Sequence, residues 1–230
     1  YGKVNFSNNN QKIDKNNNYE ISSKNYKLIE NETDISDWLI EAEENGEISI
    51  DTESSSLAPH QAKLVGISLS TKPGNACYIP LNHTKGKNLN EKKIIEILKP
   101  ILEDKSVKKI GQNIKFDYII LYHRGIDMNP LEDTMLMSYV LDAGKNKHNM
   151  DTLSEIHLNH KPITYKELVG TGKKQINFSE VDIKNAKNYA SEDADITYRL
   201  YKIFLKNLKS EKLLNIYETF EKPLIKILAL

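Results

Sequence analysis

A helical run that begins near Asp182 constrains the fold of this chain more than any other stretch. Its apolar stripe can be followed over seven positions: Ala186, Ala190, Ile196, Leu200, Ile203, Phe204 and Leu208. Residues four apart share one face of a helix, so Tyr189 and Asp193 point the same way, along the edge of that stripe. A charged side chain turned toward the interior is normally paired, metal-bound or neutralised. The helix therefore predicts a buried partner for the Asp193 carboxylate.

The composition is typical of a soluble globular protein. Of the 230 residues, 39% are hydrophobic and 28% are charged, and no apolar run approaches the roughly 18 residues that could span a membrane. Lys plus Arg and Asp plus Glu both number 32, so local basic loops or metal ions would have to hold a nucleic-acid partner. The single cysteine, Cys77, excludes an internal disulfide. We expect a cytoplasmic monomer without a membrane partner. Because the chain begins without Met and ends in an apolar run, we expect a piece of a longer protein.

Patterns along the chain predict five short strands and several helices. Residues 47–53, 65–69 and 76–81 alternate as strands do and are separated by turns, which favours an antiparallel trio. Further strands are expected at residues 26–29 and 108–111. Helices are expected at residues 35–45, 90–104, 114–123 and 131–141, after Asn149, and in the run from Asp182. The predicted fold class is α/β, with a mixed, partly antiparallel five-stranded sheet flanked by helices. Residues 7–18, rich in Asn and Lys, are typical of a linker.

Three further acids lie where they could join Asp193. Side chains alternate across a strand, so Asp51 and Glu53 project from the same face, and Asp117 interrupts an apolar helical stripe. Two like charges about 4 Å apart cost on the order of 4 kcal/mol at an effective dielectric constant near 20. Convergence of these acids would therefore require cations, and ligands that are all oxygen favour Mg²⁺ or Mn²⁺.

Two such ions about 4 Å apart are a common arrangement for in-line attack on a phosphodiester. Tyr189 has an ordinary pKa near about 10, so it is a poor base at neutral pH. We expect its hydroxyl to orient the attacking water.

Three motifs resemble those of a known family. Ile50-Asp51-Thr52-Glu53 with Leu57, then Gly111 to Asp117, then Tyr189 to Asp193 resemble the exonuclease motifs of the DEDD superfamily, in the subgroup with tyrosine in the last motif. The stretches at residues 133–135, 147–151 and 189–195 are similar to the 3′-5′ proofreading domains of bacterial family A DNA polymerases. The resemblance runs from about residue 26 to residue 230.

The resemblance implies an RNase H-like fold and removal of 5′-mononucleotides from a single-stranded or frayed DNA 3′ end. It implies two divalent cations, Mg²⁺ or Mn²⁺, one held by Asp51, Glu53 and Asp193 and the other by Asp51 and, through water, Asp117. It also implies a lead-in at residues 1–25, an exonuclease domain at 26–208, and at 209–230 the start of a helical segment leading to a polymerase domain.

Six further residues would contact the substrate if the resemblance holds. Leu57 would wedge against the terminal bases, and Phe116 and Tyr165 would pack on the nucleotide. The remaining three would contact sugar or phosphate: Gln112, Asn113 and Lys147. Family members often have Tyr at the position of Phe116 and Arg at the position of Lys147. The first difference removes a hydroxyl, and the second keeps the charge but loses the two-pronged geometry of a guanidinium group.

Two other functions are compatible with the residues. A free-standing 3′-5′ exoribonuclease similar to RNase D would use the same acids, although the polymerase-like tail at residues 220–230 argues against it. A catalytically silent module could bind primer ends or act as a spacer between domains. Intact acids in all three motifs argue against the silent module.

Several polar residues have simpler interpretations. We expect Glu192 to face solvent and Asp195 to form a surface ion pair with Arg199, four residues away. His157 and His160 have a metal-like spacing but no third ligand nearby. The Gly170 to Lys174 loop lacks the Walker pattern, so it is equally compatible with a basic loop that faces substrate and with an ordinary turn.

Overall fold

The computed structural model describes residues 21–56 and 58–229. Residues 1–20 of the expected lead-in, and Leu57, lie outside them. No helix in the described ranges is long and apolar enough to cross a membrane. Cys77 is buried on a strand, as expected.

The sheet is mixed and has six strands in the order β1-β4-β3-β2-β5-β6. Their bounds are β1 Lys27–Leu28, β2 Glu47–Ser54, β3 Leu64–Lys72, β4 Asn75–Pro80, β5 Lys108–Gly111 and β6 Leu131–Asp133. The β2-β3 and β3-β4 pairs are antiparallel, which confirms the predicted trio, and the β1-β4, β2-β5 and β5-β6 pairs are parallel. The expected count of five strands is wrong by one.

The missing strand is β6, within a stretch that we expected to be entirely helical. Leu131–Asp133 is a strand and the helix starts only at Thr134. Asp133 caps that helix, because its carboxylate accepts hydrogen bonds from the N–H groups of Met135 and Leu136 at 2.9 and 3.3 Å. Three residues are too few for strand alternation to be seen in the sequence.

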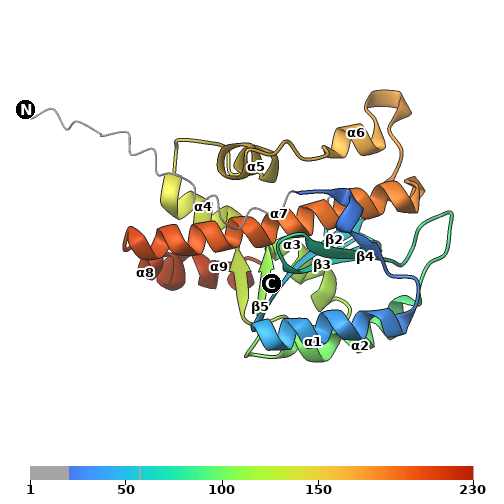
Figure 1. Ribbon diagram of the computed structural model, residues 1–230, viewed down its shortest axis with the longest axis horizontal. Coiled ribbons are helices and arrows are strands. Elements are labelled where there is room, and N and C mark those ends of the chain that lie inside the picture. Colours follow the sequence, from blue (N-terminus) through green and yellow to red (C-terminus); the bar gives the residue numbers. More distant parts are fainter. Residues whose placement is uncertain (1–20, 57, 230) are drawn as a thin grey trace, which may run out of the picture.

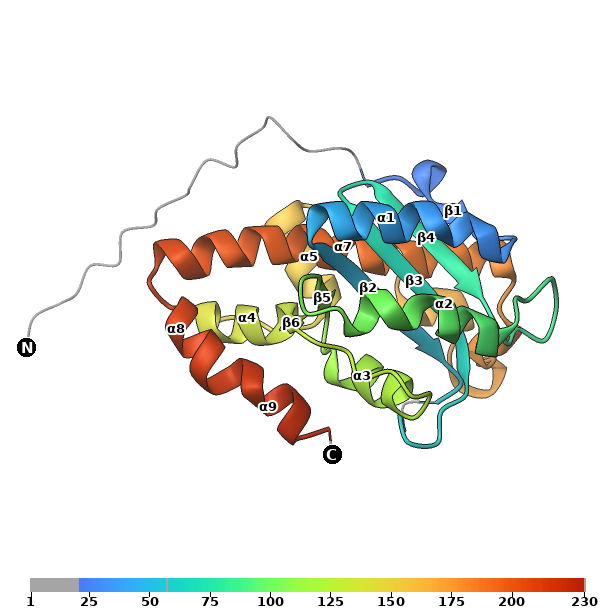
Figure 2. The same cartoon turned by 90° about the horizontal axis from the view of Figure 1, so that it is seen from below.

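Helices cover both faces of the sheet (Figures 1 and 2). The α-helices are α1 Ser36–Asn45, α2 Glu91–Glu103, α3 Lys115–Tyr122, α4 Thr134–Asp142, α5 Met150–Leu158, α6 Tyr165–Val169, α7 Ile183–Ser210, α8 Leu214–Ile216 and α9 Lys222–Ile227. Helix α7 crosses one face of the sheet, with α5 and α6 on its outer side, whereas α1 and α2 lie on the opposite face (Figure 1). Helix α3 shares a core cluster with α1 and α2. Shorter turns of helix are η1 Ser23–Asn25, η2 Glu32–Ile35, η3 Gly172–Lys174, η4 Phe178–Glu180 and η5 Tyr217–Glu221.

Small residues let α7 approach the sheet closely. Ala186, Ala190 and Ala194 are fully buried on the helix. The strands provide equally small partners: Asp51 pairs with Ser68, and Glu53 pairs with Gly66. The Tyr78 ring fills the space that a side chain at Gly66 would take, and it belongs to one core cluster with Ala186 and Ala190. This close contact between α7 and the sheet positions the candidate site.

The C-terminal helices pack back onto β6. The Tyr217 hydroxyl is fully buried; it accepts a hydrogen bond from the N–H of Asp133 at 2.9 Å and donates to Glu132 at 3.1 Å. Lys222 adds an ion pair to Glu132 at 2.7 Å. Residues 217–222 therefore share buried polar contacts with the sheet.

Candidate active site

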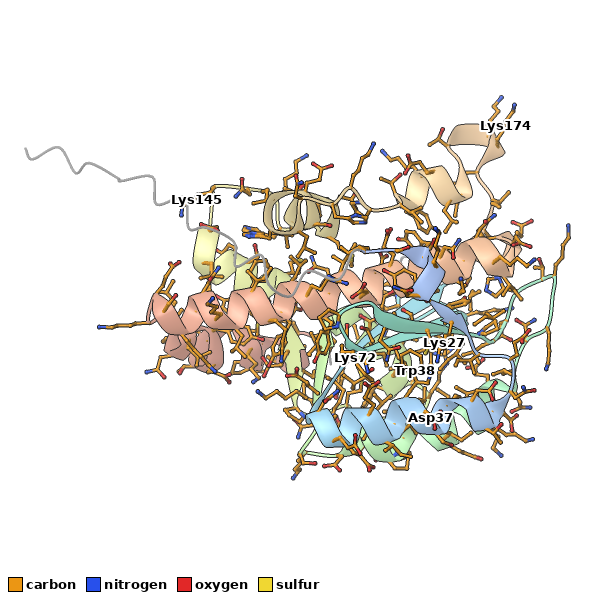
Figure 3. The ribbon with its side chains drawn as sticks, viewed as in Figure 1. Lys27, Asp37, Trp38, Lys72, Lys145 and Lys174 are labelled. Carbon is orange, nitrogen blue, oxygen red and sulfur yellow. The ribbon has the colours of Figure 1, made fainter. Side chains whose placement is uncertain are left out.

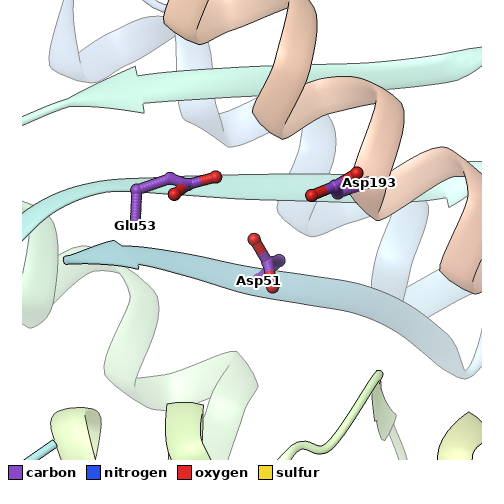
Figure 4. Close-up of side chains that lie close together, drawn as sticks. All are labelled: Asp51, Glu53 and Asp193. Carbon is purple, nitrogen blue, oxygen red and sulfur yellow. The ribbon is translucent and has the colours of Figure 1, made fainter. Parts of the chain in front are cut away.

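Three of the four predicted acids meet between β2 and α7. Carboxylate oxygens of Asp51, Glu53 and Asp193 all lie within 4.8 Å of one another. Figure 4 shows the Asp51 and Glu53 side chains rising from one face of β2 toward Asp193 on the helix. Strand alternation and helix facing, the two periodicities used to predict the site, bring these groups together.

Asp117 reaches the cluster from the other side of the sheet, on α3. Its Oδ1 atom accepts hydrogen bonds from the backbone N–H of Thr52 at 2.8 Å and from the Thr52 hydroxyl at 2.5 Å. Burial and the Asp51 charge raise the pKa of Asp117 well above its usual value, although the Thr52 hydrogen bonds act in the opposite direction. The fourth acid is therefore adjacent to Asp51 but outside the group of three.

The acids resist ionisation when no cation is present. Burial raises the pKa of Asp51 to about 6. Burial, followed by the charges of Asp51, Asp193 and Asp117, raises the pKa of Glu53 well above its ordinary value. The Glu53 Oε1 atom is buried and receives no hydrogen bond from any residue that the structure describes.

A divalent cation fits this donor set. It would neutralise the repulsion among the acids and give the buried Glu53 oxygen a partner. The ligands are carboxylates, so the site suits a hard cation.

Tyr189 lies one helical turn before Asp193 and faces the same acids. Burial, then Asp193 and the two β2 acids, raise its pKa well above that of an ordinary phenol. Tyr165 and Phe178 complete an aromatic group around it, with ring centroids 6.3 and 6.1 Å from the Tyr189 ring. The hydroxyl therefore stays protonated at neutral pH, as a hydrogen-bonding group.

A pocket of about 640 Å³ opens over the acids. Nine of the predicted site residues line it: Asp51, Glu53, Gln112, Asn113, Phe116, Asp117, Tyr165, Tyr189 and Asp193. Sequence reasoning missed Ser54 to Ser56 and the stretch from Gln175 to Asn177, which also line the pocket. A hydrogen bond of 2.8 Å from the Asn177 amide to the carbonyl of Ser55 joins the two stretches. No motif in the sequence marks that pairing, because 122 residues separate its partners.

The three residues expected to contact sugar or phosphate lie in different surroundings. Lys147 is exposed and is not among the residues that line the pocket. Gln112 lines the pocket, but its amide already bonds protein atoms: it donates to the carbonyl of His148 at 2.8 Å and accepts from the Thr134 hydroxyl at 2.5 Å. Gln112 therefore ties the loop that carries Lys147 to the start of α3. Asn113 is exposed at the rim, in a left-handed conformation with φ of 56°.

The expectation that Glu192 faces solvent is wrong. Glu192 is buried, because the segment after α5 folds over it. It accepts hydrogen bonds from the ring of His160 at 2.9 Å and from the N–H of Ile163 at 2.7 Å. His157 does not share this contact, since its ring packs edge-on against Phe204 with centroids 4.9 Å apart.

The expected ion pair between Asp195 and Arg199 exists at 2.8 Å, but it is not on the surface. Asp195 is fully buried and Arg199 is 6% exposed. Asp195 also accepts hydrogen bonds from the Tyr26 hydroxyl and from the N–H of Gly74, each at 2.9 Å. The β1 strand and the β3-β4 turn cover this side of α7, which the spacing along the helix could not reveal.

Converging carboxylates under an open pocket are the arrangement expected of hydrolases that act with divalent cations, a class that includes nucleases. A family model described as 3′-5′ exonuclease matches residues 26–209, and the chain belongs to that family. DNA polymerase I of Rhizobium leguminosarum is 41% identical over 212 residues, which are 84% of this chain and 21% of the relative. The chain thus spans about a fifth of the length of this relative.

Solved structures share the fold, which is RNase H-like. The Pol1 polymerase domain from M. smegmatis, in complex with DNA primer-template and dNTP, aligns with a TM-score of 0.68 at 17% identity, over 88% of this chain and 31% of that one. Escherichia coli RNase D, an exoribonuclease, aligns with a TM-score of 0.67 at 16% identity, over 89% of this chain and 50% of that one.

Proposed function

We propose that this chain removes 5′-mononucleotides from the 3′ ends of DNA and serves as the proofreading part of a DNA polymerase I. The observation that supports this most directly is the cluster of Asp51, Glu53 and Asp193 beside Tyr189 in a pocket. The preference for DNA is supported by the identity to a DNA polymerase I. The polymerase domain of the parent chain is likewise a proposal, supported by the length of that relative.

The acids would hold two divalent cations, Mg²⁺ or Mn²⁺. Asp51, Glu53 and Asp193 would bind one, and Asp51 and Asp117 would bind the other, Asp117 through water. When bound, such cations promote ionisation of the attacking water and stabilise the leaving oxygen. The acids of the chain fix where those charges lie, because they are carried by β2, α3 and α7, whose buried residues belong to the hydrophobic core.

The remaining pocket residues would bind and orient the reactants. Tyr189 keeps its proton, so it orients the water by a hydrogen bond. Phe116 and Tyr165 offer ring faces to the terminal base, and stacking of this kind accepts any base. Asn113 at the rim would contact sugar or phosphate. Leu57, Gln112 and Lys147 remain predicted contacts.

Digestion of a 5′-labelled single-stranded DNA with Mg²⁺ or Mn²⁺ tests the proposal. We expect a ladder shortened from the 3′ end that Asp51→Ala and Asp193→Ala both abolish, because each removes a cation ligand. Asp37→Ala, which changes an exposed acid on α1, is the matched control and should leave the ladder intact. Full activity in either cluster variant would contradict the metal assignment.

An RNA oligonucleotide of the same sequence distinguishes the exoribonuclease alternative. The shared fold with Escherichia coli RNase D is the observation that keeps this alternative open. We expect faster shortening of the DNA strand under identical conditions. Faster shortening of the RNA strand would favour the exoribonuclease function and contradict the DNA assignment. If neither strand is shortened, the silent module is favoured.

A further inference from the structure

Thr52 lies between the two acids of β2 and faces the opposite side of the sheet. The alternation that turns Asp51 and Glu53 toward α7 turns Thr52 toward the face that α3 covers. Ile48 and Ile50 share that face and belong to the core that includes Ile114 and Tyr118. Thr52 itself is 6% exposed. It is therefore the residue of β2 that is best placed to reach a side chain on α3.

The end of β5 creates room for this contact. Strand β5 pairs with β2 only from Glu47 to Ser49, and the chain leaves the sheet after Gly111 to enter α3. Beyond Ser49, the β5 side of β2 has no strand partner among the residues that the structure describes. The N–H and hydroxyl of Thr52 are directed there, and both donate to the same oxygen of Asp117. Asp117 thus supplies the hydrogen-bond acceptor that a neighbouring strand would otherwise provide. Two donors from Thr52 fix one of its carboxylate oxygens.

We propose that Thr52 is a positioning residue that orients Asp117 for the second divalent cation. The inference rests on the proposed two-cation function and deepens it. Asp117 approaches from the other face of the sheet and stands outside the group of three acids, so it needs its own orienting contact. Hydrogen-bond partners of a ligating carboxylate fix its direction, and their loss commonly weakens metal affinity or activity by about 10- to 100-fold.

Binding of Mn²⁺ to the full chain tests this role without relying on activity. Free Mn²⁺ is measured by electron paramagnetic resonance during titration, with thymidine 5′-monophosphate present as a product of the proposed reaction. In the unmodified protein we expect two ions with different affinities. Thr52→Val keeps the shape and the backbone donor but removes the hydroxyl. It should raise the Kd of the weaker ion by about 10-fold or more and leave the tighter ion within about 2-fold.

Two further variants separate positioning from packing. Thr52→Ser restores the hydroxyl and should restore the weaker site. Thr197→Val removes a buried hydroxyl on α7 that has no hydrogen-bond partner among the described residues, and both ions should bind as in the unmodified protein.

The outcomes distinguish this inference from the proposed function. Two ions bound by the unmodified protein and equally well by Thr52→Val would overturn the role of Thr52 alone. Equal weakening of both ions in Thr52→Val, without recovery in Thr52→Ser, would also overturn it, because a general loss of packing would then be the cause. Fewer than two ions in the unmodified protein would contradict the two-cation function itself.

Discussion

Tyr189 has a pKa that burial, Asp193 and the β2 acids raise well above that of an ordinary tyrosine. The pKa is raised because ionising the phenol would add a negative charge beside several carboxylates. The group therefore remains a hydrogen-bond donor over the whole physiological pH range. Its position could be predicted from the sequence because only the spacing of four residues from Asp193 was needed.

For Tyr189→Phe we expect slower cleavage with normal cation binding. A hydrogen bond to a charged group contributes about 1.5–3 kcal/mol, so the rate should fall on the order of 10- to 100-fold. Tyr201→Phe is the control, since Tyr201 is a fully buried tyrosine of the same helix whose hydroxyl accepts from Lys108. Single-turnover digestion and Mn²⁺ titration measure the two effects. Loss of Mn²⁺ binding in Tyr189→Phe would show that the hydroxyl acts on the acids and not on the water.

Asp195 gives a prediction about stability at the same scale. Removing one partner of a buried pair typically costs about 3–5 kcal/mol, so Asp195→Ala should lower the free energy of unfolding by that amount. Asp142→Ala removes the exposed pair with Lys145 (Lys145 is labelled in Figure 3) and should cost about 0–1 kcal/mol. Urea denaturation compares them. Equal losses in the free energy of unfolding would mean that burial does not increase the contribution of the Asp195 pair to stability.

The Asp195 pair also shows a limit of sequence reasoning. Asp195 and Arg199 are separated by four residues on a helix, a spacing that buried and exposed pairs share. Burial comes from Tyr26, 169 residues away, and from the turn at Gly74. Local periodicity contains no information about such distant partners.

Two faces of helix α7 contribute to the candidate site. Its inner face presents Tyr189 and Asp193 to the acids of β2, and Glu192 anchors the connection between α5 and α6 through His160 and Ile163. Because α6 begins at Tyr165, the two hydrogen bonds of Glu192 help to position the Tyr165 ring at the pocket. The apolar stripe was predictable, but the outer contact was not, since the segment that covers Glu192 has no regular pattern.

Glu192→Gln should therefore affect substrate binding more than chemistry. The amide keeps the shape of Glu192 but replaces one acceptor oxygen by a donor, so the connection to α6 loosens. A neutral hydrogen bond contributes roughly 1 kcal/mol, and we expect KM to rise about 5-fold while kcat stays within about 2-fold. Glu155→Gln, an exposed change on α5, is the control. A fall in kcat at constant KM would instead place the effect of Glu192 at its neighbour Asp193.

Some strands of the sheet are marked by local sequence patterns, and one depends on contacts with residues far away along the chain. Strands β2 to β4 were predicted because alternation and turns mark them within a short stretch. Strand β6 was not, because its identity depends on pairing with β5 and on the burial of Glu132 by Tyr217 and Lys222. Those residues lie about 85 to 90 positions away along the chain. The short strand is therefore a product of tertiary contacts.

Across the whole molecule the formal net charge is +0, but the distribution is uneven. Four acids gather at one pocket, and burial raises the pKa values of all four. Repulsion from neighbouring acids raises the pKa further for Glu53, Asp117 and Asp193. A carboxyl whose pKa is higher in the folded than in the unfolded state binds protons more tightly when folded. Its contribution to stability is present at low pH and is lost as the pH rises from about 4 through the raised pKa. Without cations, the site should thus destabilise the fold at neutral pH.

Asp193→Asn isolates this effect, because it removes one charge without changing the shape of the side chain. In a chelator at pH 7.5 we expect the variant to have a higher Tm than the unmodified protein, by roughly 2–4 °C for each kcal/mol of relieved repulsion. At pH 5 the difference in Tm should shrink, because protonation already relieves the repulsion.

Saturating Mn²⁺ at pH 7.5 should make the unmodified protein the more stable of the two, since it binds the ion with one more ligand and gains more stability from it. Thermal unfolding at both pH values, with chelator and with Mn²⁺, measures all four conditions. A variant that is less stable than the unmodified protein in the chelator at pH 7.5 would show that Asp193 stabilises the fold through its charge, which is incompatible with a carboxylate that requires a cation as its partner.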